Sequence, residues 1–248
     1  MKKASALTVL ALMGSICTNA QDTKKFRLGL QVCPNMGWIT TDVKGYESDG
    51  ARLGFRFGLL GDVQLGSNAN YFFSTGLFLN NLGSKTKTTF TTSDSTGTVS
   101  TTTFTGENKF QYIELPVSIK LKTNEMGYMT YFGQLGFGSA FCVSAKSVEY
   151  SYNAVSTGIG ADARFDREEK ANILKETVPF RASLVVGVGA EYKFAGNTAL
   201  VFGINYNNGF TDTFDKAVLF DRKDAEVGDQ VEAHGKLHYG ELLLGVYF

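Results

Sequence analysis

Apolar and polar residues alternate with a period of two in eight segments of the chain. Such alternation predicts β-strands with one apolar and one polar face. Each segment is close to the ~9 to 11 residues that a tilted strand needs to cross a bilayer. The predicted strands are residues 26–33, 51–62, 71–80, 110–122, 128–143, 178–194, 198–207 and 237–248.

The last predicted strand is the most informative, because it finishes on an aromatic residue. Leu242, Leu244, Val246 and Phe248 share one face, and Glu241 lies on the other. The final strand of a closed membrane barrel must pair with the first strand and present an apolar face to lipid. We therefore interpret the four apolar residues as an insertion signal for the machinery that assembles barrels.

The links between the predicted strands alternate in length. Short links cover residues 63–70, 123–127 and 195–197, whereas long links cover 34–50, 81–109, 144–177 and 208–236. Successive antiparallel strands run in opposite directions, so the short links, which follow the second, fourth and sixth strands, all lie at one end. An even number of strands also returns the chain to its starting side. The pattern predicts an all-β fold, an eight-stranded antiparallel transmembrane β-barrel with short periplasmic turns and long extracellular loops. A secreted β-sandwich gives no reason for such sorting.

Residues 1–20 have the features of a signal peptide. Lys2 and Lys3 give a positive start, an apolar run follows, and small residues precede a cleavage site after Ala20. Ile16 stands where a lipid-attachment signal at Cys17 needs a small residue. The prediction is a barrel domain over residues 21–248, located in the outer membrane of a Gram-negative bacterium.

Composition and charge exclude several classes of function. Removing Lys2 and Lys3 from 24 basic residues leaves 22 against 24 acidic ones, and no basic stripe indicates nucleic-acid binding. Cys33 and Cys142 fall on opposite walls of the predicted barrel, which predicts free thiols. Neither the cysteines nor the two histidines, His234 and His238, have convincing metal-ligand spacing. No metal or cofactor is expected.

The inward faces of the predicted strands carry many charged residues, which burial makes costly unless each is paired. An eight-stranded barrel is just wide enough for side chains to fill its interior, so it should be plugged. Arg56, Glu114 and Glu241 fall at similar depth and should meet. We favour a structural ion network over a gate or a proton path. Its predicted members are Arg56, Glu114, Glu241, Arg52, Arg181, Glu191 and Lys120.

Three local features carry separate expectations. Residues 84–105 are mostly Ser and Thr around a turn at 94–97, which favours a hairpin over disorder because Thr prefers extended backbone. A charged run within 161–175 is compatible with a short helix or a solvated loop. Pro116 interrupts a strand pattern that continues beyond it, which predicts a bulge or local distortion.

The sequence also resembles a known family. The run 112–120 (YIELPVSIK) resembles the Y-L-E-I-P strand of the PorT-like outer-membrane β-barrel family, often labelled porin family. The Gly-rich runs 53–58 and 187–192 and the run 205–210 support the resemblance, which covers essentially the whole mature chain. The name-giving member is associated with an apparatus that secretes proteins across the outer membrane, whereas most members have no assigned activity. The resemblance therefore implies location and fold more than a task.

The function we expect is non-enzymatic: an envelope accessory or interaction protein, with secretion among its candidate roles. Expected partners are outer-membrane lipid, the barrel-assembly machinery, and secretion or other envelope proteins. A narrow channel for ions or small solutes is the alternative. An outer-membrane hydrolase is a third reading, for which the last long loop offers Asp212, Asp215, Asp221, Asp224 and His234.

Overall fold

A computed structural model describes residues 26–42, 46–67, 69–93, 99–156, 167–196, 198–214 and 234–248. The predicted signal peptide and the turn predicted at residues 94–97 lie outside the described residues. In the part described, every named element is a strand. No helix among these residues is long and apolar enough to cross a membrane.

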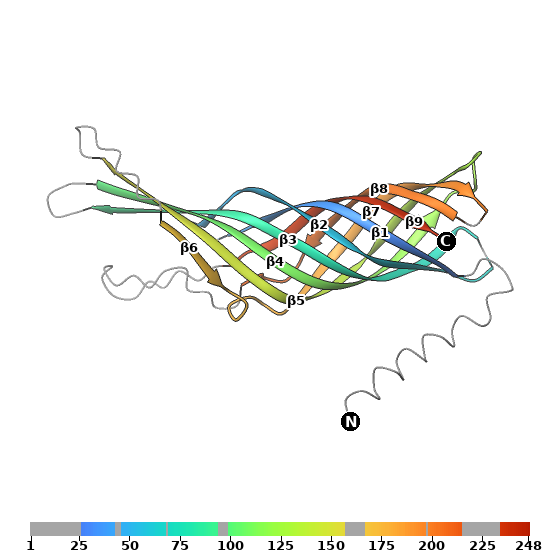
Figure 1. Cartoon of the computed structure of the whole chain (residues 1–248), viewed down its shortest axis with the longest axis horizontal. Coiled ribbons are helices and arrows are strands. Elements are labelled where there is room, and N and C mark those ends of the chain that lie inside the picture. Colours follow the sequence, from blue (N-terminus) through green and yellow to red (C-terminus); the bar gives the residue numbers. More distant parts are fainter. Residues whose placement is uncertain are drawn as a thin grey trace, which may run out of the picture.

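Eight long antiparallel strands form a closed barrel (Figure 1). Each strand pairs with the next long strand along the chain, and β1 pairs with β9 to complete the cylinder. The predicted eight-stranded all-β fold is confirmed. The strands are β1 Phe26–Thr40, β2 Tyr46–Gln64, β3 Tyr71–Ser93, β4 Val99–Lys122, β5 Met129–Ser156, β7 Phe180–Ala195, β8 Thr198–Gly209 and β9 Lys236–Tyr247.

A short additional strand, β6 (Arg167–Asn172), pairs with the distal part of β5. The helix considered within residues 161–175 is therefore wrong for this stretch. The physical reason is that β5 extends beyond the part that pairs with β7 and leaves the backbone N–H and C=O groups of that edge without a partner strand. A passing strand can satisfy these groups, and a helix cannot.

The strands β3, β4 and β5 project well beyond the rest of the barrel (Figure 1). The ladder between β3 and β4 is continuous in register out to the pair Ser93 and Val99, so the predicted Ser/Thr-rich hairpin is present. Most of the expected long loops are consequently paired strand. The sequence underestimates these strands because both of their faces are polar, which hides the alternation.

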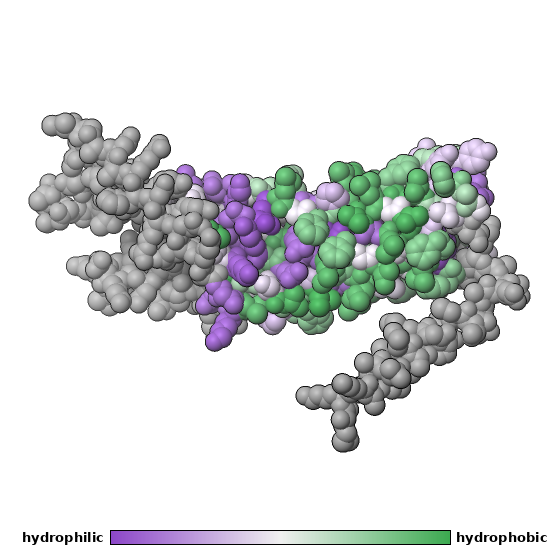
Figure 2. All heavy atoms as spheres, viewed as in Figure 1, coloured by the Kyte–Doolittle hydropathy of each residue, from purple (hydrophilic) through white to green (hydrophobic). Residues whose placement is uncertain are grey.

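A band of apolar side chains covers the outer face of the barrel that Figure 2 shows. Leu53 is 77% exposed and Leu135 is 58% exposed, and the same face of every barrel strand carries further exposed aliphatic or aromatic residues. So large a continuous apolar surface is unfavourable in water and suits lipid. Leu242, Leu244 and Phe248, each more than half exposed, belong to this band.

Pro116 causes a local interruption and no bulge. The register between β3 and β4 is the same on both sides of it, but pairing is missing between Thr75–Val117 and Phe78–Glu114. The hydroxyl of Thr75 donates to the carbonyl oxygen of Pro116 at 2.9 Å. The side chain thereby supplies a donor next to the site where proline has none.

Two glycines of β2 provide a matched test of the close contacts between strands. A Cβ on Gly58 would lie 2.1 Å from the backbone oxygen of Leu77, whereas a Cβ on Gly61 would meet only side-chain carbons at 3.5 Å or more. We predict that Gly58→Ala destabilises the barrel by about 1–3 kcal/mol through overpacking. Gly61→Ala should be near neutral. Urea unfolding in detergent micelles measures both, and equal effects would contradict the prediction.

Candidate functional site

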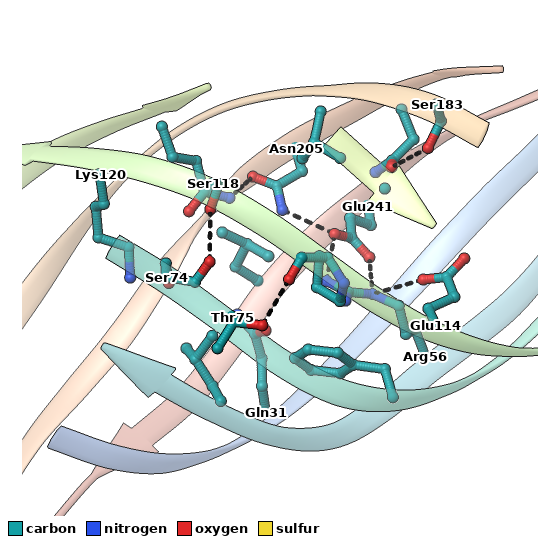
Figure 3. Close-up of a pocket in the computed structure, with 18 of the residues that line it drawn as sticks. Gln31, Arg56, Ser74, Thr75, Glu114, Ser118, Lys120, Ser183, Asn205 and Glu241 are labelled. Carbon is teal, nitrogen blue, oxygen red and sulfur yellow. Dashed lines mark hydrogen bonds and ion pairs between the residues drawn. The ribbon is translucent and has the colours of Figure 1, made fainter. Parts of the chain in front are cut away.

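The middle of the barrel interior holds a buried layer of charged and amide side chains (Figure 3). Arg56 from β2 donates to both carboxylate oxygens of Glu241 from β9, with Nε–Oε2 2.8 Å and Nη2–Oε1 2.6 Å. Asn205 of β8 donates to the same carboxylate at 2.8 Å. The inward alternation of three different strands therefore brings these groups to one level.

Glu114 of β4 completes this layer. Its carboxylate lies 3.9 Å from Nε of Arg56 and 3.9 Å from Nη1 of Arg181. Asn80 donates to Glu114 at 2.9 Å, and the hydroxyl of Tyr239 donates to it at 3.1 Å. We call Arg56, Glu114, Arg181 and Glu241 the central ion layer; its two positive and two negative charges cancel.

Little space remains around the central ion layer. The guanidinium of Arg56 lies over the ring of Phe78, with 4.1 Å between Cζ and the ring centroid. The cavity that its side chains line has a volume of about 40 Å³. That is room for roughly three waters at most. The layer is thus a packed network of the kind that stabilises a narrow barrel.

A second ion network lies nearer the end with the short turns. Lys120 and Lys122 contact Asp62 at 2.9 Å and 3.4 Å. Lys122 also contacts Glu191 at 2.7 Å, and Glu191 contacts Arg27 at 2.6 Å. Six strands contribute to this periplasmic network, because Tyr247 of β9 donates to Asp62 and accepts from Lys120, each at 2.7 Å, and Ser74 of β3 also donates to Asp62.

An apolar layer fills the interior on the extracellular side of the central ion layer. Its aromatic part includes Phe110, Tyr112 and Phe214, and the rings of Phe110 and Phe214 have centroids 6.1 Å apart. Phe214 lies in the segment after β8, which bridges to the segment before β7 through Thr177. We call this cluster the outer apolar layer. Its members are Ile39, Tyr46, Leu82, Phe110, Tyr112, Ala140, Ala145, Phe214, Leu237 and Tyr239.

The predicted network residues divide among three places. Arg56, Glu114, Glu241 and Arg181 meet in the central ion layer, whereas Lys120 and Glu191 join the periplasmic network.

Arg52 requires a correction, because it belongs to neither layer. It pairs with Glu107 at 2.7 Å, and the two side chains are 22% and 29% exposed. Register shifts between β2 and β3 on either side of Ala51 break the strict alternation that placed Arg52 inside.

Several interior partners were not predicted. Asp62 and Lys122 are the last residues of the predicted strands 51–62 and 110–122 and continue their inward alternation, but they were not included among the network members. Asn80 was missed because its strand is apolar on both faces in places. Tyr247 lies on the polar face predicted for the last strand, but its phenol gave no sequence signal of a partner.

Two other groups of residues bear on the expected chemistry. Cys33 and Cys142 are both free thiols. Near the extracellular mouth, His234 Nδ1 lies 3.9 Å from Asp212, and both side chains are about half exposed. That distance is too long for a hydrogen bond. The other acidic residues considered for a hydrolase, Asp215, Asp221 and Asp224, lie outside the described residues.

A comparison with protein families agrees with the barrel geometry. The family model described as "outer membrane protein beta-barrel domain" matches residues 19–215, which is most of the chain. The chain belongs to this outer-membrane β-barrel family. The membership and the lipid-facing band together place this barrel in the outer membrane of a Gram-negative bacterium. The comparison with curated proteins gave no match.

Solved structures of low sequence identity resemble this barrel. Neisserial surface protein A is 13% identical, with a TM-score of 0.45, and the match covers 90% of this chain and 96% of that one. Ail, the attachment invasion locus protein of Yersinia pestis, is 14% identical, with a TM-score of 0.36 and coverage of 90% and 95%. The outer membrane protease OmpT of Escherichia coli is 10% identical, with a TM-score of 0.35 and coverage of 92% and 99%.

The central ion layer predicts a large cost for removing one charge. Arg56→Met leaves the carboxylate of Glu241 buried without its guanidinium partner and removes one of the two guanidiniums near Glu114, so we expect a loss of about 3–5 kcal/mol of unfolding free energy. Arg52→Met, on the same strand but in a partly exposed pair, should cost about 1 kcal/mol or less. Urea unfolding in lipid vesicles compares the two. Adding Glu241→Gln to Arg56→Met should recover part of the loss.

Outside the apolar band, the Arg52–Glu107 pair predicts a pH dependence. The hydrogen bond from Arg52, opposed in part by desolvation, lowers the pKa of Glu107 below its ordinary value. Because the folded-state pKa is depressed, the stabilisation is present above the ordinary pKa and is lost as the pH falls through the lowered one. An NMR titration of the Glu107 carboxyl should show its pKa rising in Arg52→Met. An unchanged pKa would disprove this origin.

Proposed function

We propose that this protein is a non-enzymatic interaction protein of the bacterial surface, which acts through the strands that project beyond the outer membrane. The single observation that carries the proposal is the contrast between a filled interior and a long external extension. Side chains occupy the lumen at three levels, so the projecting part of β3, β4 and β5 is the part available to other molecules.

The filled interior argues against the alternative of a narrow channel. A conducting path would have to cross the outer apolar layer, where mostly hydrocarbon side chains would have to replace the water around an ion. It would then have to separate the paired charges of the central ion layer. Both steps are costly for a solute of any charge.

The same features argue for a structural rather than catalytic role of the buried charges. Glu241 accepts from the guanidinium of Arg56 and the amide of Asn205, whereas Glu114 lies 3.9 Å from two guanidiniums and accepts from an amide and a phenol. Such groups position and neutralise charge. A hydrolase would need a nucleophile and a base that converge where substrate can enter.

Secretion is the envelope process that we propose to test first. The reason is the resemblance of residues 112–120 to the PorT-like family, whose name-giving member is associated with protein export. In this proposal the barrel anchors the projecting strands next to other envelope proteins and does not itself transport cargo.

Conductance tests the sealed interior. Purified protein reconstituted into planar lipid bilayers should give no stable single-channel steps, because the outer apolar layer and the central ion layer both block ion passage. A porin of known conductance serves as the positive control. Reproducible unitary steps from the unmodified protein would overturn the non-conducting reading and favour the channel.

A trimmed hairpin tests the external role. Residues 89–103 would be replaced by Asn-Gly, which joins the paired positions Thr88 and Phe104 without changing the barrel register. In a deletion strain assayed for protein secretion and envelope integrity, the trimmed protein should fail to correct the defect. Gly61→Ala, which leaves the projection intact, should correct it. Full complementation by the trimmed protein would contradict the proposal.

A further inference from the structure

Two lysines face one another across neighbouring strands on the outer wall of the barrel. Lys109 of β4 and Lys146 of β5 are direct partners in the antiparallel ladder, and both side chains are exposed. Like charges directly opposite each other are destabilising. An anion placed between the two ammonium groups would convert this repulsion into attraction.

Further cations surround this pair. Glu107 contacts Arg52 at 2.7 Å and Lys109 at 3.3 Å, and it also stands directly opposite Lys85. One carboxylate therefore has two cations in contact with it and a third directly opposite it in the ladder, before Lys146 is counted. We define the basic ridge as Arg52, Lys85, Lys109 and Lys146 together with Glu107, which gives a net charge of +3.

The basic ridge lies just outside the lipid-facing band. On β5, Phe141 and Val143 are 50% and 43% exposed, and Lys146 follows three residues later. Three residues advance a strand by about 10 Å, or about 8 Å along the membrane normal for a tilt of about 40°. The headgroup layer is about 5–8 Å thick on each side of the hydrocarbon core. Hydrophilic residues border the hydrophobic band on this face in Figure 2.

We propose that the basic ridge is a binding site for the phosphate groups of a phosphorylated glycolipid in the outer leaflet. The lysines and Arg52 supply charge-assisted hydrogen bonds to phosphate oxygens. The apolar wall directly below the ridge on β4 and β5 contacts the acyl chains of the same molecule. This continuity of a cationic site with an apolar wall favours a lipid over a free anion.

The site is separate from the proposed surface role. It sits at the level of the membrane surface, and the trimmed-hairpin variant retains all of its residues. Failure of the complementation experiment would therefore leave this inference standing, and failure of lipid binding would leave the interaction role standing.

Native mass spectrometry of the purified barrel in detergent tests the site with a bisphosphorylated lipid A. The double variant Lys109→Gln/Lys146→Gln should bind about 30-fold more weakly, since each basic residue near an anionic lipid surface contributes a factor of about five. The matched control is Lys193→Gln, which removes an exposed lysine near the short-turn end, paired with Glu125 at 3.4 Å. It should bind like the unmodified protein.

The source of the phosphate and the folding of the variants are tested in parallel. A dephosphorylated lipid A should bind weakly, and millimolar inorganic phosphate should not displace the phosphorylated form. Heat-modified mobility on gels establishes that each variant remains a folded barrel. Equal binding by the double variant, equal binding of the dephosphorylated lipid, or displacement by inorganic phosphate would each overturn the proposal.

Discussion

The structure depends on pairing charges inside a cylinder whose outside is solvated by lipid. The bidentate contact between Arg56 and Glu241 joins β2 to β9 across β1, which lies between them in the sheet. Because water has little room inside, neither group could be left alone without a cost of several kcal/mol. The amides around them satisfy remaining hydrogen-bonding capacity. The closed barrel and the neutral layer therefore require each other.

The chemistry of the interior changes along its axis in a definite order. A network with three basic and two acidic residues lies toward the periplasm, a neutral ion layer occupies the centre, and apolar rings fill the extracellular side. The outside of the barrel is different, since an apolar band covers the wall around the charged part of the interior and polar residues border this band. Period-two alternation makes both possible, because inner and outer faces of one strand can be specified independently.

Most of the barrel could be predicted from the sequence, and the exceptions have physical causes. Alternation located the strand ends at the short turns well, where the face toward lipid must change at once to polar turn residues. It failed above the membrane, where the pattern disappears, so β1, β2 and β5 were predicted too short, whereas the preference of Thr for extended backbone indicated the hairpin that prolongs β3 and β4. Arg52 was wrongly assigned to the interior because the alternation of apolar and polar residues does not reveal the irregular strand pairing beside Ala51. Arg56, Glu114 and Glu241 were predicted together because equal depth on three strands needs only residue counting.

The constant register between β3 and β4 has a mechanical consequence. Apart from the interruption at Pro116, residues from Tyr71 to Ser93 pair with residues from Leu121 to Val99 in a single register, from inside the membrane to the far end of the projection. A pull along the strands loads many hydrogen bonds in shear at the same time. Force applied at the distal end would thus pass through this ladder to the membrane-embedded wall.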